Sequence, residues 1–222
     1  MNYIISIIPP EGLNILTELY KSRKLPMILT VPGSGTATQS MRELLGLATS
    51  EKRVVMTVAS ETQTADLILA HRRYLFIDTP GNGILISVPV KSVGGGKTLE
   101  FLNTADLGKL PSLNPDYELI LVIANSGHTD TVMDAARSAG ARGGTVLHAK
   151  GTGGKKDGKF FKVSIAQEKE VILIVASKAD KANIMRSVME QAGIQTEAGA
   201  ITFSLPVTDV AGFGFREKEA SV

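Results

Sequence analysis

The stretch Glu51–Ser60 (EKRVVMTVAS) occurs again as Glu168–Ser177 (EKEVILIVAS), with six of ten positions identical. A second stretch, Ser87–Gly95 (SVPVKSVGG), occurs again as Ser204–Gly212 (SLPVTDVAG), with five of nine identical. Both pairs have the same offset of 117 residues (168 − 51 and 204 − 87). This period corresponds to a whole domain, because solenoid repeats run to about 20–50 residues. The sequence therefore predicts two copies of one small domain.

The repeat divides the 222 residues into three predicted parts. Residues 1–95 form the first copy, residues 96–116 a linker, and residues 117–222 the second copy. Each copy has about 100 residues, which is enough to bury a core and fold without disulfides.

Composition excludes several classes of protein. Hydrophobic residues make up 43% and charged residues 21%, as in ordinary globular proteins. The absence of cysteine excludes disulfides and thiolate metal sites. A net charge of +2 and an aromatic content of 5% disfavour a nucleic-acid partner. No apolar run approaches the roughly 18 residues of a membrane helix, and the N-terminus lacks a signal-peptide pattern, so we expect no membrane insertion and a cytoplasmic protein.

The apolar periodicity predicts the same order of elements in both copies: strand, helix, strand, strand, helix, strand. The first copy has strands at Tyr3–Ile8, Met27–Val31 (halted by Pro32-Gly33), Lys52–Ala59 and Gly83–Val90, and helices at Glu11–Lys21 and after Ser60. The second has strands at Leu119–Ile123, Thr145–Ala149, Lys169–Ala176 and Ile201–Leu205, and helices at His128–Ala139 and Asp180–Ala192. Gly140 is the expected stop of the first of these helices, and the second is predicted to point Ile184, Met185, Val188 and Met189 inward. This order predicts an α+β protein made of two tandem ferredoxin-like (βαββαβ) domains, each a four-stranded antiparallel sheet with both helices on one face.

Local signals refine this prediction. Ser60 and Gln63 have the spacing of a capping box, and Ala65, Ile68 and Leu69 are the predicted buried stripe of the helix that follows. Strands such as VILIVA are apolar at nearly every position, as in sheets covered on both faces. We therefore expect sheets to pack on other sheets and the protein to form a homo-oligomer.

A glycine-rich loop follows the second strand of each copy. One contains Gly33, Ser34, Gly35 and Thr36, and the other Lys150, Gly151, Thr152 and Gly153. Glycine allows turns in which successive amides surround an anion, and the hydroxyls and the lysine add donors. The alternative is a mobile hairpin tip with solvated lysines.

A second glycine turn precedes the last strand of each copy. It contains Gly81, Asn82 and Gly83 in the first copy and Glu197 and Gly199 in the second. A plain tight turn is the alternative to a ligand-binding one.

Other motifs are weaker. Gly94–Thr98 resembles the end of a P-loop and includes Lys97, but it lacks the first glycine of that motif. Histidines 71, 128 and 148 are isolated, which favours surface or helix-end positions and no metal site. No nucleophile and base are recognisable, so the sequence predicts no catalytic residues and no enzyme.

Three segments of the second copy together resemble the P-II nitrogen-regulatory signal proteins. They are Gly143–Gly153 (GGTVLHAKGTG), Glu170–Ser177 (EVILIVAS) and Ala200–Val207 (AITFSLPV). The similarity covers nearly all of Glu118–Phe213 and, through the repeat, more weakly Tyr3–Gly95.

The resemblance implies a homotrimer that binds adenine nucleotides (ATP, ADP or AMP) in clefts between subunits, needs no cofactor, and regulates a transporter or enzyme through the loop between strands two and three. By position, Thr145, Lys150, Gly151 and Gly153 match the base of that loop. Gly81-Asn82-Gly83 matches the Gly-Asp-Gly turn that holds phosphate.

The sequence departs from the family where basic residues are expected. Ile84 and Ile201 replace the lysine after the glycine turn. The arginine pair beyond the last strand falls on Gly212 and Gly214, or on Gly95 and Lys97. Each lost charge-assisted hydrogen bond contributes about 1.5–3 kcal/mol, or tenfold or more in affinity. Two alternatives remain open: a metal-tolerance-type trimer that binds cations, and a small phosphoryl-transfer enzyme.

Overall fold

The computed structural model describes residues 1–37, 43, 50–91, 112–151, 159–160, 163–164 and 167–212. The chain forms two compact units. Unit 1 comprises Met1–Pro32, Thr38–Tyr117 and Pro206–Val222, and unit 2 comprises Gly33–Ala37 and Glu118–Leu205. Each unit therefore includes a segment from the other half of the sequence. The division into two repeated copies and a linker stays a prediction.

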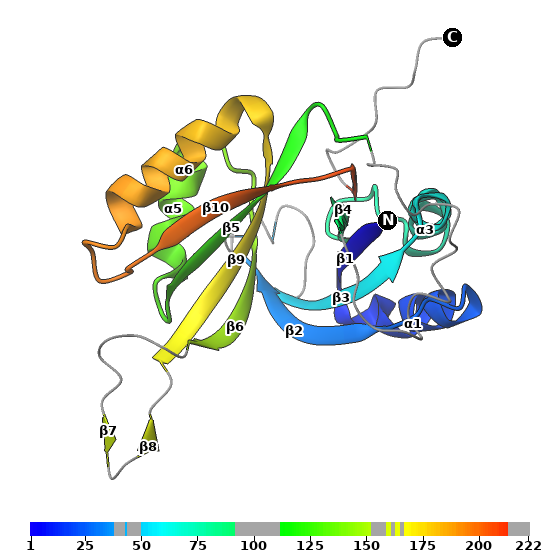
Figure 1. The fold of residues 1–222 in the computed structure, drawn as a ribbon, viewed down its shortest axis with the longest axis horizontal. Coiled ribbons are helices and arrows are strands. Elements are labelled where there is room, and N and C mark those ends of the chain that lie inside the picture. The colour runs from blue at the N-terminus through cyan, green and yellow to red at the C-terminus, as the bar shows by residue number, and fades with distance from the viewer. Residues whose placement is uncertain are drawn as a thin grey trace. The chain divides into compact units, whose positions relative to one another are not determined.

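Unit 1 contains a β-sheet and two α-helices (Figure 1). Its elements are β1 (Asn2–Ile8), η1 (Pro10–Gly12), α1 (Leu13–Ser22), the first part of β2 (Leu29–Gly35), β3 (Glu51–Ala59), α3 (Glu61–Leu75), β4 (Ile84–Pro89) and β11 (Asp209–Gly212). The strand order is β2-β3-β1-β4-β11. Strand β1 is antiparallel to β3 and β4, so Ser6 lies opposite Val55 on one side and Leu85 on the other. Strand β11 is antiparallel to β4.

The core of unit 1 lies between the sheet and both helices. Leu16 of α1 and Leu67 of α3 are fully buried in one cluster with Ile4 of β1 and Val55 of β3. Because residues of alternate strand positions enter this cluster, the two helices cover the same face of the sheet.

Unit 2 repeats the same architecture. Its elements are β5 (Tyr117–Asn125), α5 (Thr129–Ser138), β6 (Thr145–Gly151), the short strands β7 (Lys159–Phe160) and β8 (Val163–Ser164), β9 (Gln167–Ser177), α6 (Lys178–Ala192) and β10 (Ile201–Pro206). The strand order is β10-β5-β9-β6, and the end of β2 lies beside β6. Helices α5 and α6 lie side by side against one face of this sheet (Figure 1). The predicted α+β fold, with ferredoxin-like βαββαβ order, is confirmed for both units.

The helices of unit 2 largely follow the predicted pattern. Ile184 and Val188 of α6 are buried, whereas Met189, which we predicted to point inward, is 38% exposed. Helix α5 ends before Gly140, which has φ +104°. A left-handed residue at this point is a common helix stop that glycine adopts without strain.

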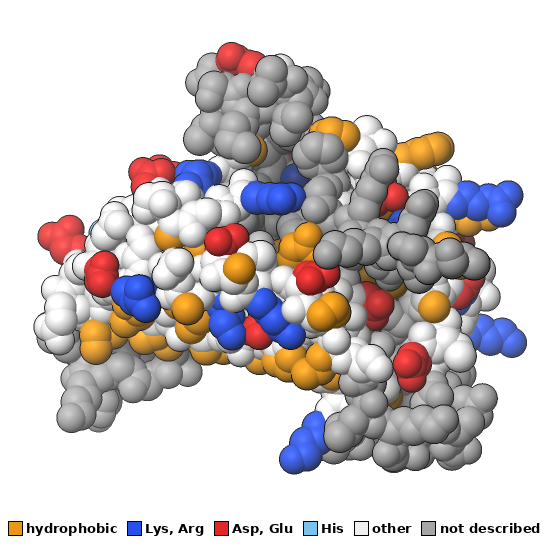
Figure 2. Space-filling view, turned by 90° about the horizontal axis from the view of Figure 1, so that it is seen from above, with side chains coloured by type: hydrophobic (Ala, Val, Ile, Leu, Met, Phe, Trp, Pro, Cys, Tyr) orange, Lys and Arg blue, Asp and Glu red, His pale blue; other side chains and the backbone are white. Residues whose placement is uncertain are grey.

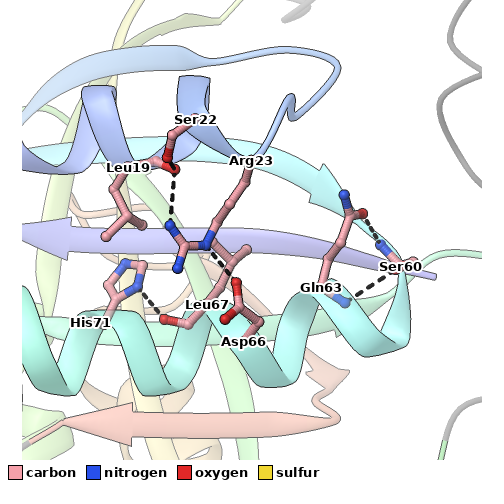
Figure 3. A network of polar contacts seen from close by, with 8 residues as sticks. All are labelled: Leu19, Ser22, Arg23, Ser60, Gln63, Asp66, Leu67 and His71. Carbon is pink, nitrogen blue, oxygen red and sulfur yellow. Dashed lines mark hydrogen bonds and ion pairs between the residues drawn. The ribbon is translucent and has the colours of Figure 1, made fainter.

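The predicted capping box of α3 is confirmed. The Ser60 hydroxyl accepts from the Gln63 amide at 3.1 Å, and the Gln63 side chain accepts from the Ser60 amide at 2.9 Å. Figure 3 shows this pair at the start of α3, with Arg23 at the end of α1 donating to Asp66 of α3 and to the Leu19 carbonyl. These contacts fix the start of α3 and join the two helices of unit 1.

The predicted end of the second strand is wrong. Strand β2 continues through Pro32 and Gly33 to Gly35, where the sequence predicted a turn. Ser34 and Gly35 pair with Val146 and Thr145 of β6. This pairing joins segments far apart in the chain and supplies hydrogen-bond partners for their backbone groups. No local residue pattern predicts it.

The predicted buried stripe of α3 is correct only at Ile68. Ala65 is exposed, and Leu69 is 63% exposed. The apolar pattern misses the polar residues Thr64 and His71, which are buried and hydrogen-bonded. The surface or helix-end position predicted for His71 is therefore wrong, since His71 is buried within α3, whereas His148 is exposed and His128 precedes α5 as expected.

Charges on the described surface are mixed. On the face drawn in Figure 2, basic and acidic side chains are interspersed, with hydrophobic side chains exposed between them. No helix among the described residues is long and apolar enough to span a bilayer.

Candidate functional site

A hollow of about 300 Å³ in unit 2 includes one of the predicted ligand residues, Lys150. It lies where β6 ends and β9 begins, and its lining comprises Ser126, His148, Ala149, Lys150, Glu168 and Lys169. We call it the β6–β9 hollow. The antiparallel register of the two strands places Lys150 opposite Glu168 and His148 opposite Glu170.

The lining of the β6–β9 hollow carries more basic than acidic groups. Lys150 and Lys169 supply two amines, His148 an imidazole, and Glu168 one carboxylate. Lys150 is exposed, whereas the Lys169 amine donates to the Asn125 Oδ1 at the end of β5. The hollow can therefore attract a small anion, with Lys150 as its most accessible cation.

Glu170 fixes the segment that leads into α5. Its carboxylate accepts from the Gly127 amide at 3.0 Å and from the Thr129 hydroxyl at 2.7 Å. Burial alone would raise the pKa of Glu170, but the bonds from Gly127 and Thr129 and the charge of His148 together lower it. Glu170 is a buried carboxylate, 5% exposed, and its bonds to Gly127 and Thr129 hold the segment beside Ser126 in place.

The turn containing Glu197 and Gly199 is joined to the same end of the sheet through Asn125. The side-chain Nδ2 of Asn125 donates to the Glu197 carbonyl, and the backbone N–H of Asn125 donates to the Ala198 carbonyl, both at 2.8 Å. Gly199 has φ +55°, and a Cβ there would lie 3.0 Å from the Asn125 Nδ2. The structure therefore connects Glu197 and Gly199 to Lys169, which lines the β6–β9 hollow.

The predicted residues Gly33 to Thr36 and Thr145 lie at the opposite end of β6. Gly33, Ser34 and Gly35 are part of β2 and have no positive φ, so the predicted turn around an anion is absent at these residues. Thr145 and Lys150 are five residues apart on β6, or roughly 17 Å in an extended strand. Within unit 2 these residues therefore form two separate groups.

Thr36 makes structural bonds that account for its side chain. Its hydroxyl donates to the Gly144 carbonyl at 3.1 Å and accepts from the Gly144 amide at 2.8 Å. The Thr36 carbonyl accepts from the Arg137 guanidinium. These bonds hold the end of β2 against the start of β6.

Thr36→Val is expected to lower the free energy of unfolding of unit 2 by about 1–3 kcal/mol, because the Gly144 amide loses its partner. Urea denaturation measures the change, and Thr36→Ser, which keeps the hydroxyl, should retain most of the stability. Equal stability of the Val and Ser variants would show that the two hydroxyl bonds do not contribute.

The turn Gly81-Asn82-Gly83 lies in unit 1. Gly81 has φ +89° and Gly83 φ +122°. The Asn82 amide donates to the Thr79 carbonyl at 3.2 Å, and Lys52 of β3 donates to the Gly81 carbonyl at 3.2 Å. Burial lowers the pKa of Lys52, and the charge of Glu11 partly opposes this. The turn thus has a cation beside it, although its Asn82 amide is already bonded within the turn.

Three further predicted residues, Lys97, Thr152 and Gly153, lie outside the described residues. The same applies to the glycine-rich segment around Lys97. Gly151 ends β6 next to Lys150.

Sequence reasoning missed Asn125, Ser126, Glu168 and Lys169. Glu168 and Lys169 open one of the repeated stretches, so their position at the start of a strand was visible. Their closeness to Lys150 follows only from the β6–β9 register. Asn125 and Ser126 come directly after an apolar strand, which is the signal that could have identified them.

Among the described residues, no group of three histidine or acidic side chains could hold a metal ion.

Residues 117–217 match the family model described as nitrogen regulatory protein P-II. The predicted resemblance is confirmed over this span, which is slightly less than half of the chain. No curated protein matches the chain significantly.

Three solved structures are similar in part. The PII protein of Arabidopsis thaliana bound to citrate is 21% identical, with a TM-score of 0.34 over 43% of this chain and 79% of its own. The B. subtilis GlnK–ATP complex is 13% identical, with a TM-score of 0.33 over 44% and 86%. An unknown protein from Galdieria sulphuraria is 10% identical, with a TM-score of 0.28 over 93% and 98%. With TM-scores of 0.34 or less, none of the three similarities supports a functional argument.

Proposed function

We propose that the protein is a P-II-like signal-transduction regulator that binds a small anionic ligand, with an adenine nucleotide as the first candidate. The observation that carries the proposal is the match of residues 117–217 to the P-II family model. The protein would act on a partner protein rather than as an enzyme, and the partner would be a transporter or an enzyme.

The β6–β9 hollow supports this proposal from the chemistry of its lining. Lys150 and Lys169 can neutralise part of a phosphate or carboxylate, and Ser126 offers a hydroxyl. Gly151 follows Lys150 at the end of β6, and no side chain of its own covers its backbone amide. The remaining predicted ligand residues, including Gly81, Asn82, Gly83 and the group at Gly33 to Thr36, belong to the proposal as possible further contacts.

A homotrimer is part of the same proposal. In unit 2, Ile201 and Phe203 of the edge strand β10 are 47% and 41% exposed. Exposed apolar side chains on a strand at the edge of a sheet favour contact with another chain. Sedimentation equilibrium measures the mass directly, and a monomer at micromolar concentration would remove the trimer from the proposal.

Titration calorimetry with ATP, ADP and AMP tests the ligand. We expect heat with at least one nucleotide, and Lys150→Gln should weaken that binding roughly tenfold or more because one charge-assisted hydrogen bond is lost. The matched control is Lys178→Gln, which removes an exposed lysine at the start of α6. No heat with any of the three nucleotides would remove the nucleotide claim.

A further inference from the structure

His148 lines the β6–β9 hollow and shares one face of β6 with Lys150, because successive side chains of a strand alternate between its faces. The register places His148 opposite Glu170 of β9. It places Lys150 opposite Glu168. Residues directly opposite in an antiparallel pair have Cβ atoms about 4.5–5.5 Å apart, so their charges interact. The imidazole is exposed and can contact a ligand in the hollow.

The other charged groups around the hollow cancel when the imidazole is neutral. Lys150 and Lys169 contribute two positive charges, and Glu168 contributes one negative charge. Glu170 contributes the second negative charge, since its pKa is lowered although burial opposes this. Two amines and two carboxylates sum to zero, so a proton on His148 gives this part of unit 2 a net positive charge.

The remaining elements packed against this end of β6 offer few charges. Strand β2, which pairs with β6, has no charged residue in Leu29–Gly35. The segment before α5 carries His128, which is partly buried and lies outside the lining. The first turn of α5 carries Asp130, which is exposed and therefore screened by solvent. Histidine is the side chain whose charge changes between pH 5 and 8, so the ring of His148 decides the charge of the hollow in this range.

We propose that His148 determines the affinity of the β6–β9 hollow for doubly charged anions. The hollow holds a compact dianion tightly when the ring is protonated and weakly when the ring is neutral. A dianion gains more from the proton than a monoanion does, because Coulomb energy is proportional to the charge of the ligand. This inference rests on the anion site proposed above and adds the residue that sets its charge.

NMR titration of the full chain with sulfate at pH 5.5 and at pH 8, at constant ionic strength, tests the role of His148. Sulfate keeps both negative charges over this range, and methyl sulfate is the matched monoanion. We expect amide shifts at Ser126 and Lys169, with sulfate bound about tenfold more tightly at pH 5.5. Methyl sulfate should gain only about threefold, the square root of that factor.

Two histidine variants separate the ring in the hollow from other titrating groups. His148→Gln keeps a polar side chain without a titrating ring, so sulfate should bind equally at both pH values. His128→Gln is the matched control, at a histidine outside the lining, and should retain the pH dependence. Since coupling between two binding events is reciprocal, sulfate should also move the titration of the His148 ring to higher pH in the wild type.

Four results would each overturn the proposal: no sulfate binding at pH 5.5, equal affinity at both pH values, an equal gain for methyl sulfate, or a pH dependence that survives His148→Gln. Sulfate binding that is independent of pH would overturn only the role of His148 and would leave the anion site in place. Failure of the nucleotide proposal is recognised separately, by calorimetry that gives no heat with ATP, ADP or AMP.

Discussion

Replacing Gly83 by alanine is expected to destabilise unit 1 by about 2–6 kcal/mol, which is the sum of a strained backbone and an overpacked contact. Gly83 has φ +122°, and a Cβ there would lie 2.2 Å from the Ile7 carbonyl oxygen. The oxygen belongs to the central strand β1 and cannot move aside cheaply. Since whole domains are stable by only about 5–15 kcal/mol, the variant should unfold at far lower denaturant concentration or fail to fold.

Gly127→Ala is the matched control. Gly127 also has a positive φ, of +86°, but a Cβ there meets nothing within 4 Å. This variant should lose only about 1 kcal/mol, the usual cost of replacing a left-handed glycine. Urea denaturation of both variants gives the comparison, and similar losses would show that the contact with Ile7 is unimportant. Because Gly83 is structurally required, its variants are unsuitable for testing whether the turn binds a ligand.

Unit 1 is expected to lose about 3 kcal/mol of stability as the pH falls from about 6.5 to about 4, because His71 is buried as a neutral ring. Burial lowers the pKa of His71 to about 4. The hydrogen bond to the Leu67 carbonyl partly opposes this shift, and the charge of Arg23 adds to it. The unfolded chain takes up a proton near pH 6.5 and the folded one does not. The stabilisation from the neutral His71 ring is therefore complete above about pH 6.5 and declines below it.

Hydrogen bonds define which ring nitrogen carries the proton. The His71 Nδ1 lies 2.7 Å from the Leu67 carbonyl, which can only accept, so Nδ1 is the donor (Figure 3). The other nitrogen, Nε2, then accepts from the Ser6 hydroxyl at 3.0 Å, and Ser6 lies 2.7 Å from the Tyr20 hydroxyl. Burial also raises the pKa of Tyr20, so this buried network stays uncharged at neutral pH.

Denaturation of the wild type and of His71→Gln across pH 4–7 measures the effect. The variant has no titrating ring, so its stability should be flat from pH 7 to about pH 4.5 even if it is lower throughout. Should the variant not fold, the ¹⁵N shifts of His71 in the wild type give a second readout. A ring that titrates near pH 6.5 in the folded protein would contradict the prediction. Glu118 and Glu170 also have lowered pKa values, but their contributions are lost below about pH 4.5.

The sequence predicted those features of the fold that depend on neighbouring residues. The capping box at Ser60 and Gln63 and the helix stop at Gly140 were both identifiable, since each is a bond or a backbone conformation within a few residues. The order of strands and helices followed from apolar periodicity and the repeat.

The errors arose where distant partners decide the outcome. Polar Thr64 and His71 of α3 occupy the core because Asn2 and Ser6 of β1 form hydrogen bonds with them. The buried face of α3 is therefore turned away from Leu69. The pairing of Ser34 with Val146 extends β2 past a proline. For the site, Lys150 was identifiable, whereas its closeness to Lys169 required the strand register.

The assignment of β11 to unit 1 and of Gly33–Ala37 to unit 2 bears on how such a protein can evolve. A gene that encoded either half alone would produce a sheet lacking a strand that the other half provides. After this reciprocal exchange, fission into two independent genes would be selected against. The two halves could then change only as one inherited entity.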